Sequence, residues 1–278
     1  MVMLKSDIDE ASACIVVAGI GPLGTDNVAA MAGRIHGVKS VLLTSAVGIE
    51  AINDDIDMLI IVIAGSGEDE WPLARGVVEH AAQLKIFVVV ISDQEFPEVW
   101  SDISQPSWLT SVAKLVVNEN CFAAWDDLVT EHMGVRSLNR LMLRLAVEQI
   151  TDLVTRQGFV CIDFADVKWG IKNGRHGHLG VGYGSGNECG ARDAVEGAIA
   201  MLERQEAQLE AVSSLLINIY GSSNMTMDDF DEINRIVHGV ASEEANIVIG
   251  VTVNDLMGSR YRVAIYTFTV PHWSRDEI

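Results

Sequence analysis

A run of three carboxylates, Glu68, Asp69 and Glu70, stands where a nucleotide-binding domain would hold a phosphate. The segment AGSGEDEWPLARGVVEHA follows the apolar run MLIIVIAG and leads into a helical pattern. Between a buried strand and a helix, backbone N–H groups and the helix dipole normally bind phosphate. Carboxylates in a first helical turn also favour the dipole, so a solvated helix start explains them equally.

A glycine turn, GIGPLG, follows the first apolar run and matches the spacing of a dinucleotide-binding turn. Gly19, Gly21 and Gly24 are in place. Pro22 removes a backbone donor, and Leu23 adds a bulky side chain where a phosphate would approach. No acidic residue ends the next strand, so we expect no dinucleotide cofactor here.

A second pair of carboxylates, Asp163 and Asp166, lies in the segment CIDFADV. Carboxylates at this spacing can polarise a water for attack on a phosphate, but only beside a bound nucleotide. Asp163 can equally cap the helix that follows it. Cys161 has too few basic neighbours in the sequence for us to expect a reactive thiol.

Two further features have both a functional and a structural interpretation. His176 and His178 have the spacing of a metal-binding pair, but they lie in a glycine-rich loop with no cysteine or carboxylate nearby. We expect them to face solvent and predict no metal site. Trp71, beside the acidic run, either anchors a protein partner or packs on its own helix.

The elements that must position these residues are short apolar runs separated by helical patterns. The runs are continuous rather than alternating, which is typical of strands buried on both faces of a parallel sheet. The first half is therefore expected to be an α/β domain of the nucleotide-binding type. The five runs span residues 14–19, 40–45, 58–65, 86–92 and 114–118.

The second half begins with a helical pattern over residues 134–156. A glycine-rich stretch and another helix follow, and then three strand candidates. The last candidate alternates between apolar and polar residues, which predicts one wetter face. We expect an α/β fold with a mostly parallel sheet, in which two α/β units are joined by a long central helix. The strand candidates are 213–221, 245–253 and 261–270, and the expected divisions are 1–133, 134–157 and 158–278.

Bulk composition excludes several classes of partner. The chain has 278 residues and a formal net charge of -20, which disfavours nucleic acid and anionic membranes. Its four cysteines show no paired spacing, so we expect free thiols and a cytoplasmic location. No secretory pattern opens the sequence, and no apolar run approaches the roughly 18 residues of a membrane span.

Four segments together resemble the second half of FtsZ, the bacterial relative of tubulin. They are TRQGFVCIDFADVKWG, LGVGYGSG, LLINIYGSSNMTMDDFDEINRIV and ANIVIGVTVNDLMGSRYRVAIYTF. The first half resembles the same family more faintly. The resemblance implies a Rossmann-like GTP-binding domain, a central helix and a smaller α/β C-terminal domain. It also implies filaments that stack head to tail, in which one subunit's nucleotide meets the next subunit's catalytic loop.

The residues that match this family divide between the two halves. The family's catalytic loop resembles NxDFADV, so Asp163 and Asp166 match and Cys161 replaces the asparagine. The family's GGGTGTG loop aligns with residues 67–73, where Gly67 alone is kept. The remnants of the GTP loops are therefore Gly19, Gly21, Gly24, Gly65 and Gly67.

The base-reading pair of the family is also changed. Its Asn-Asp pair aligns with Arg140 and Leu141, although Asn139 is one residue away and a shift of register would restore it. The family's further loop between the second and third strands is deleted here, since only residues 46–57 separate the two apolar runs. After Val270 the family's linker and C-terminal peptide have no counterpart, so we expect no membrane attachment by that route and no direct membrane insertion.

The carboxylates of the acidic loop determine whether we expect GTP to bind. Each carboxylate near a phosphate costs about 1 kcal/mol at 4 Å in water and about 4 kcal/mol at a dielectric constant of 20. We therefore predict no cofactor and no productive GTP binding; the alternative is GTP or GDP bridged to the acidic loop by Mg²⁺. The expected partner is a second copy or another FtsZ-like protein, stacked head to tail. The interface residues are Glu68, Asp69, Glu70 and Trp71 on one face and Asp163 and Asp166 on the other.

Overall fold

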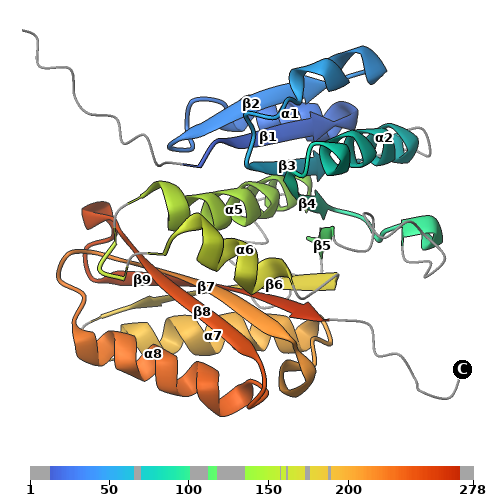
Figure 1. The fold of residues 1–278 in the computed structure, drawn as a ribbon. Coiled ribbons are helices and arrows are strands. Elements are labelled where there is room, and N and C mark those ends of the chain that lie inside the picture. Colours follow the sequence, from blue (N-terminus) through green and yellow to red (C-terminus); the bar gives the residue numbers. More distant parts are fainter. Residues whose placement is uncertain are drawn as a thin grey trace, which may run out of the picture.

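The computed structural model describes residues 13–65, 70–100, 112–117, 135–156, 158–160, 162–172, 176–186 and 189–269. Within these ranges the strands form one sheet in the order β2-β1-β3-β4-β5-β6-β9-β7-β8. Figure 1 shows β1 to β4 with α1 and α2 in one half, and β6 to β9 with α7 and α8 in the other. Helices α5 and α6 lie between the halves (Figure 1). This arrangement is the α/β fold with a mostly parallel sheet that the sequence predicts.

The five strands of the first half are all parallel, and the five apolar runs predicted them correctly. β1, β3 and β4 are buried along their whole length, as expected for strands covered on both faces. A 3₁₀ helix, Ala46–Ala51, follows β2. The elements are β1 (Ile15–Ile20), α1 (Gly21–Met31), β2 (Val38–Leu43), β3 (Met58–Ile63), α2 (Glu70–Gln83), β4 (Phe87–Ser92) and β5 (Ala113–Val116).

The predicted central helix is α5, Val135–Thr155. Its buried face includes Leu138, Met142 and Leu145, which repeat at helical spacing and belong to the same core cluster as β1, β3 and β4. The same cluster contains Tyr266 and Phe268 from the last strand. The helix therefore packs on both halves of the molecule at once.

The second half contains the three predicted strands and one that was not predicted. β9 is antiparallel to both β6 and β7, whereas β7 and β8 are parallel. The elements are α6 (Phe164–Lys172), β6 (His176–Ser185), α7 (Gly190–Arg204), β7 (Ser214–Gly221), α8 (Met227–Val240), β8 (Asn246–Val253) and β9 (Arg260–Thr269).

Residues His176–Ser185 of the glycine-rich stretch form strand β6, not a loop. Gly180, Gly182 and Gly184 alternate along one face, and a Cβ at any of them would overlap the backbone of α7. The absence of side chains lets the helix lie directly on the strand. β9 also differs from expectation, because it is buried on both faces rather than wet on one. It lies between β6 and β7, with α5 packed on one face and α7 on the other.

A buried polar network ties α5 to the second half. The hydroxyl of Tyr220 donates a hydrogen bond to the carboxylate of Asp152, which also pairs with Arg156 at 2.8 Å. The hydroxyl of Tyr266 donates to the backbone carbonyl of Ala146 at 2.8 Å. Burial raises the pKa of Asp152, although the hydrogen bond from Tyr220 and the charge of Arg156 oppose that shift.

Candidate functional site

The carboxyl edge of β1 and β3 is where α1 starts. Ile20 precedes the helix in an extended conformation, and Gly21 follows with a φ of 76° that suits glycine. A Cβ at Gly19 would lie 2.6 Å from the carbonyl oxygen of Gly24, and a Cβ at Gly24 would lie 2.6 Å from that of Val62. Gly19 and Gly24 are therefore needed for close packing of α1 on the sheet, whether or not a nucleotide binds.

The turn after β3 is covered by a side chain of α1. Gly65 has a φ of 59°, and a Cβ on it would overlap the side chain of Leu23. The side chain of Leu23 therefore lies against the turn, as we expected for a bulky residue in the glycine turn. Its side chain occupies space that a phosphate would need in order to reach the backbone of this turn.

The backbone N–H of Gly65 already has an anionic partner. It donates to both carboxylate oxygens of Asp93, at 3.0 and 3.1 Å. Burial raises the pKa of Asp93, and the hydrogen bond from Gly65 opposes this shift. The chain thus supplies its own carboxylate to a backbone donor at the carboxyl end of β3. Sequence reasoning missed Asp93, although it comes directly after a predicted strand that lies beside β3.

A second carboxylate, that of Glu70, lies over the start of α1. A Cβ at Gly21 would be 3.0 Å from Cγ of Glu70 and 3.5 Å from its Oε1. The other oxygen, Oε2, is buried without a hydrogen-bond partner. Glu70 is the first residue of α2, as the acidic first turn predicts. The other predicted members of this loop, Gly67, Glu68 and Asp69, lie outside the described residues.

Trp71 does not occupy an exposed loop tip. Its side chain is 9% exposed and packs against the rings of Phe96 and Trp100, at centroid distances of 5.3 and 5.5 Å. The structural interpretation of Trp71 is therefore the one that the geometry supports. The burial of this ring favours packing within the fold over a contact with a partner.

Asp163 and Asp166 form a reciprocal cap at the start of α6. The backbone N–H of Asp166 donates to Oδ1 of Asp163 at 2.8 Å, and that of Asp163 donates to Oδ2 of Asp166 at 3.2 Å. Both residues are nevertheless exposed. Exposed aromatic side chains occur nearby in the sequence, at Phe159 and at Trp169 in α6, with exposed fractions of 55% and 51%. Cys161 lies outside the described residues.

The residues aligned with the base-reading pair lie beside a hollow between α1 and α5. Arg140 pairs with Asp26 of α1 at 3.5 Å, and Leu141 lines the same hollow. Asn139 is not among the lining residues, and its Oδ1 is buried without a hydrogen-bond partner. On its α5 side the hollow therefore presents Arg140, Leu141 and Arg144, whereas Asp26 and Asn27 line it from α1.

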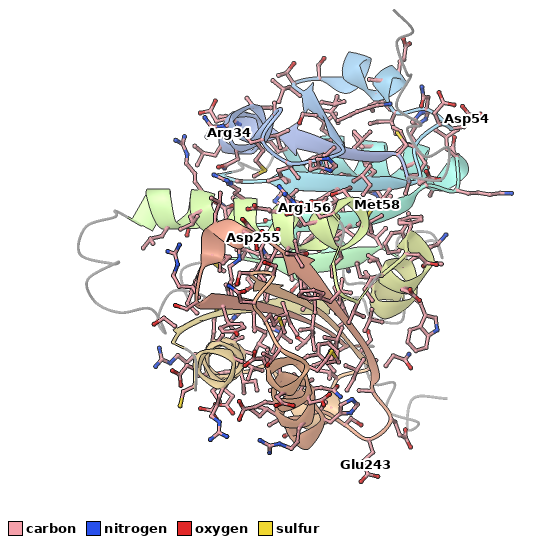
Figure 2. The ribbon with its side chains drawn as sticks, turned by 90° about the vertical axis from the view of Figure 1, so that its left-hand side faces the viewer. Arg34, Asp54, Met58, Arg156, Glu243 and Asp255 are labelled. Atoms are coloured by element: carbon pink, nitrogen blue, oxygen red, sulfur yellow. The ribbon has the colours of Figure 1, made fainter. Side chains whose placement is uncertain are left out.

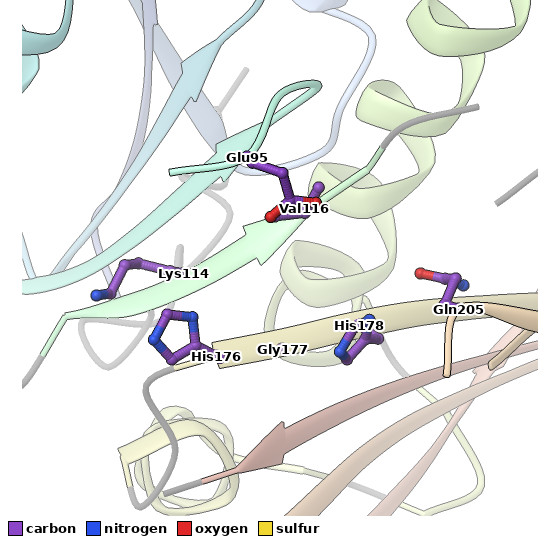
Figure 3. A pocket seen from close by; sticks show the side chains of 7 residues that line it. All are labelled: Glu95, Lys114, Val116, His176, Gly177, His178 and Gln205. Carbon is purple, nitrogen blue, oxygen red and sulfur yellow. The ribbon is translucent and has the colours of Figure 1, made fainter. Parts of the chain in front are cut away.

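His176 and His178 lie on strand β6, which corrects their expected place in a loop. They line a cavity of about 190 Å³ at the β5–β6 junction, together with Glu95, Lys114 and Gln205 (Figure 3). Burial lowers the pKa of His178, and a carboxylate, Glu95, lines the same cavity. Across the described ranges, no group of three or more His, Cys, Asp or Glu residues is arranged to hold a metal ion.

Comparison with known proteins agrees with this geometry. Residues 176–269 match the C-terminal domain of the FtsZ family. The cell division protein FtsZ of Buchnera aphidicola subsp. Baizongia pistaciae is 32% identical over 225 residues, which cover 78% of this chain and 58% of that protein. The FtsZ of Coxiella burnetii is 32% identical over 130 residues, which cover 47% of this chain and 33% of that protein.

The chain belongs to the FtsZ/tubulin superfamily. Solved structures agree with the fold of this FtsZ-like chain. An empty FtsZ dimer from M. jannaschii has a TM-score of 0.77 at 20% identity, covering 95% of this chain and 90% of that one. A GTPγS-form TubZ protofilament from Bacillus thuringiensis serovar israelensis has a TM-score of 0.66 at 10% identity, covering 95% and 89%.

Two facts limit what the FtsZ-like chain shares with these relatives. The chain spans 33% of the length of the Coxiella burnetii FtsZ and 58% of the length of the Buchnera aphidicola FtsZ. The family model matches the second half, whereas the residues that would hold a nucleotide lie mainly in the first half. In the part that the structure describes, no helix is long and apolar enough to cross a membrane.

Proposed function

We propose that this FtsZ-like chain is a cytoskeletal subunit of the cell-division type that has lost productive GTP binding and acts through protein contacts. The observation that carries the proposal is the hydrogen bonding of Gly65 to the carboxylate of Asp93. A phosphate would have to displace an anion that is already in place. It would do so beside Glu70 and under the side chain of Leu23.

The magnitude of the effect supports this proposal. One carboxylate about 4 Å from one phosphate charge costs about 4 kcal/mol at an effective dielectric constant of 20. Since 1.4 kcal/mol is a tenfold change in affinity, each such pair lowers the affinity for the nucleotide by about three orders of magnitude. Asp93 and Glu70 both belong to this edge of the sheet, and Pro22 supplies no backbone donor to offset them.

The opposite face supports a role in contacts between subunits. Asp163 and Asp166 are exposed at the start of α6, where they can face a neighbour's bound nucleotide. The superfamily relatives include a dimer and a protofilament. A second copy would oppose these carboxylates with Glu70 and Asp93. A partner that holds a nucleotide with its divalent cation would present a cation instead, so an active FtsZ-like protein is the favoured partner.

Nucleotide binding is the direct test. We expect fluorescent GTP to show no saturable binding to the purified chain up to about 1 mM, which corresponds to about -4 kcal/mol. The measurement is made with and without Mg²⁺, and an active FtsZ serves as the positive control. Micromolar affinity in Mg²⁺ would contradict the proposal and would support a GTP-hydrolysing protein with a rearranged pocket.

A gain-of-function variant makes the test sharper. Changing Asp93→Asn and Glu70→Gln removes both negative charges and keeps the size of the side chains. If these carboxylates exclude the nucleotide, the double variant should bind GTP at least about tenfold more tightly than the native chain. The matched control is Asp193→Asn with Glu203→Gln, on α7 in the other half of the molecule. Equal weak binding by both variants would assign the loss to the missing backbone donors instead.

A further inference from the structure

The hollow between α1 and α5 has a different chemistry from the rest of this acidic chain. It is lined by Arg34, Arg140 and Arg144, and by one carboxylate, that of Asp26. The chain as a whole carries 39 acidic and 19 basic residues. Three guanidinium groups around one small hollow therefore reverse the local sign of the charge. Arg34 follows α1 on the outer surface of the first half (Figure 2).

The guanidinium groups of this hollow are only weakly engaged. Arg140 pairs with Asp26 at 3.5 Å, with side chains 48% and 66% exposed, and Arg144 pairs with Glu148 at 3.8 Å. Exposed ion pairs of this kind contribute little, because water screens them. Within the described ranges, Arg34 makes no ion pair. Donors of fixed, planar geometry therefore remain available to an incoming anion.

The floor of the hollow is mostly apolar, and its size is small. Met31 is buried beneath it, and Leu141 and Ala30 also line it. Asn27 is a buried polar member of the lining, and its Nδ2 donates to the carbonyl of Leu23 at 2.7 Å. The cavity is about 210 Å³, which is below the roughly 300–1,000 Å³ of pockets for drug-sized ligands. A whole nucleotide therefore does not fit inside it. One side chain with an aliphatic stem and an anionic end does.

We infer that this hollow is a docking site for an acidic segment of a protein partner. One glutamate side chain of that segment enters the hollow, with its methylene groups on Met31 and Leu141. Its carboxylate accepts hydrogen bonds from Arg34 and Arg144. Arg140 leaves its ion pair with Asp26 and pairs with the incoming carboxylate instead. The inference rests on the proposed loss of GTP binding, because the residues aligned with the base-reading pair line the same hollow. It does not depend on the proposed function of the Asp163 and Asp166 face.

A peptide titration tests the inference. The probe is a fluorescein-labelled peptide of alternating Glu and Leu, compared with a peptide of alternating Gln and Leu. We expect saturable binding of the acidic peptide by fluorescence anisotropy, weakened by added salt, and at least about tenfold weaker binding of the Gln peptide. Equal binding of the two peptides would overturn the inference. Tighter binding of inorganic phosphate or GTP, measured by competition, would overturn it as well and assign the hollow to a small anion.

Matched variants locate the binding surface. Arg34→Gln with Arg144→Gln should weaken acidic-peptide binding at least about tenfold, as expected when charge-assisted hydrogen bonds are lost. The control is Arg235→Gln, an arginine of α8 whose side chain is 69% exposed, and binding should stay within about twofold. Ala30→Phe fills the hollow from an exposed position without changing charge and should also abolish binding. Unchanged affinity in both hollow variants would refute the assignment, and thermal unfolding of each variant verifies that it is folded.

Discussion

Asp163 and Asp166 accept hydrogen bonds from each other's backbone N–H groups, at 2.8 and 3.2 Å, and so close the first turn of α6. The pair therefore has a structural function that needs no partner, in addition to any function at an interface. Because the carboxylates are exposed, the two functions can be separated by substitutions that keep the cap and remove the charge.

Asp163→Ala and Asp163→Asn should differ in stability. Alanine removes the cap and should lower the free energy of unfolding by about 0.5–2 kcal/mol, whereas asparagine caps as well as aspartate and should cost much less. Urea unfolding followed by circular dichroism measures both variants. Equal losses would show that the charge, and not the hydrogen bond, stabilises α6.

The same two variants test the proposed contact with a filament. If Asp163 acts on a neighbour's nucleotide, both Ala and Asn should reduce the effect of the chain on GTP turnover by an active FtsZ, since both remove the carboxylate. Phosphate release and co-sedimentation with assembled filaments are the measurements. If only the Asp163→Ala variant reduces the effect on GTP turnover, the function of Asp163 is capping. If the native chain leaves every filament unchanged, the proposed contact is refuted.

Gly24 and Gly239 form a matched pair of helical glycines. Gly24→Ala in α1 places a Cβ 2.6 Å from the carbonyl oxygen of Val62 and should destabilise by about 1–3 kcal/mol. Gly239→Ala in α8 meets nothing within 4 Å and should stabilise by about 0.4–1 kcal/mol. Thermal unfolding without nucleotide gives both values. A neutral Gly24→Ala would show that α1 does not need the close approach.

The buried carboxylate of Asp152 predicts a pH dependence of stability. Folding raises its pKa above the usual 3.8, so ionisation costs more in the folded chain than in the unfolded one. Its contribution therefore favours folding at low pH and declines as pH rises through the folded pKa. Asp152→Asn cannot ionise, so the stability of the native chain relative to this variant should fall over the pH range that begins near the ordinary pKa of aspartate, about 4, and extends upward. Urea unfolding across that range measures the difference, with the exposed Asp193→Asn as the control.

A relative stability that rises with pH would contradict the raised pKa. It would mean that the hydrogen bond from Tyr220 and the ion pair with Arg156 outweigh the cost of burial. The Tyr220→Phe variant then identifies the stronger partner. Loss of the rise in that variant would assign the effect to the hydroxyl of Tyr220.

Several elements could be predicted from the sequence because their signals are local. The continuous apolar runs of β1, β3 and β4 require burial on both faces, and the spacing of Leu138, Met142 and Leu145 requires a helix with one buried face. Strand β6 was missed because glycine has low strand propensity, and its glycines are explained only by the backbone of α7 above them.

The candidate site divides in the same way. The sequence by itself determined that the phosphate-side loops carry Pro22, Leu23 and Glu70, since residue identity is enough to remove donors and add bulk and charge. Only the tertiary structure decided that Asp93 binds Gly65, that Trp71 is buried, and that three arginines share one hollow. Those relationships join residues distant in the chain, and parallel strands and crossing helices set them, so no local pattern can encode them.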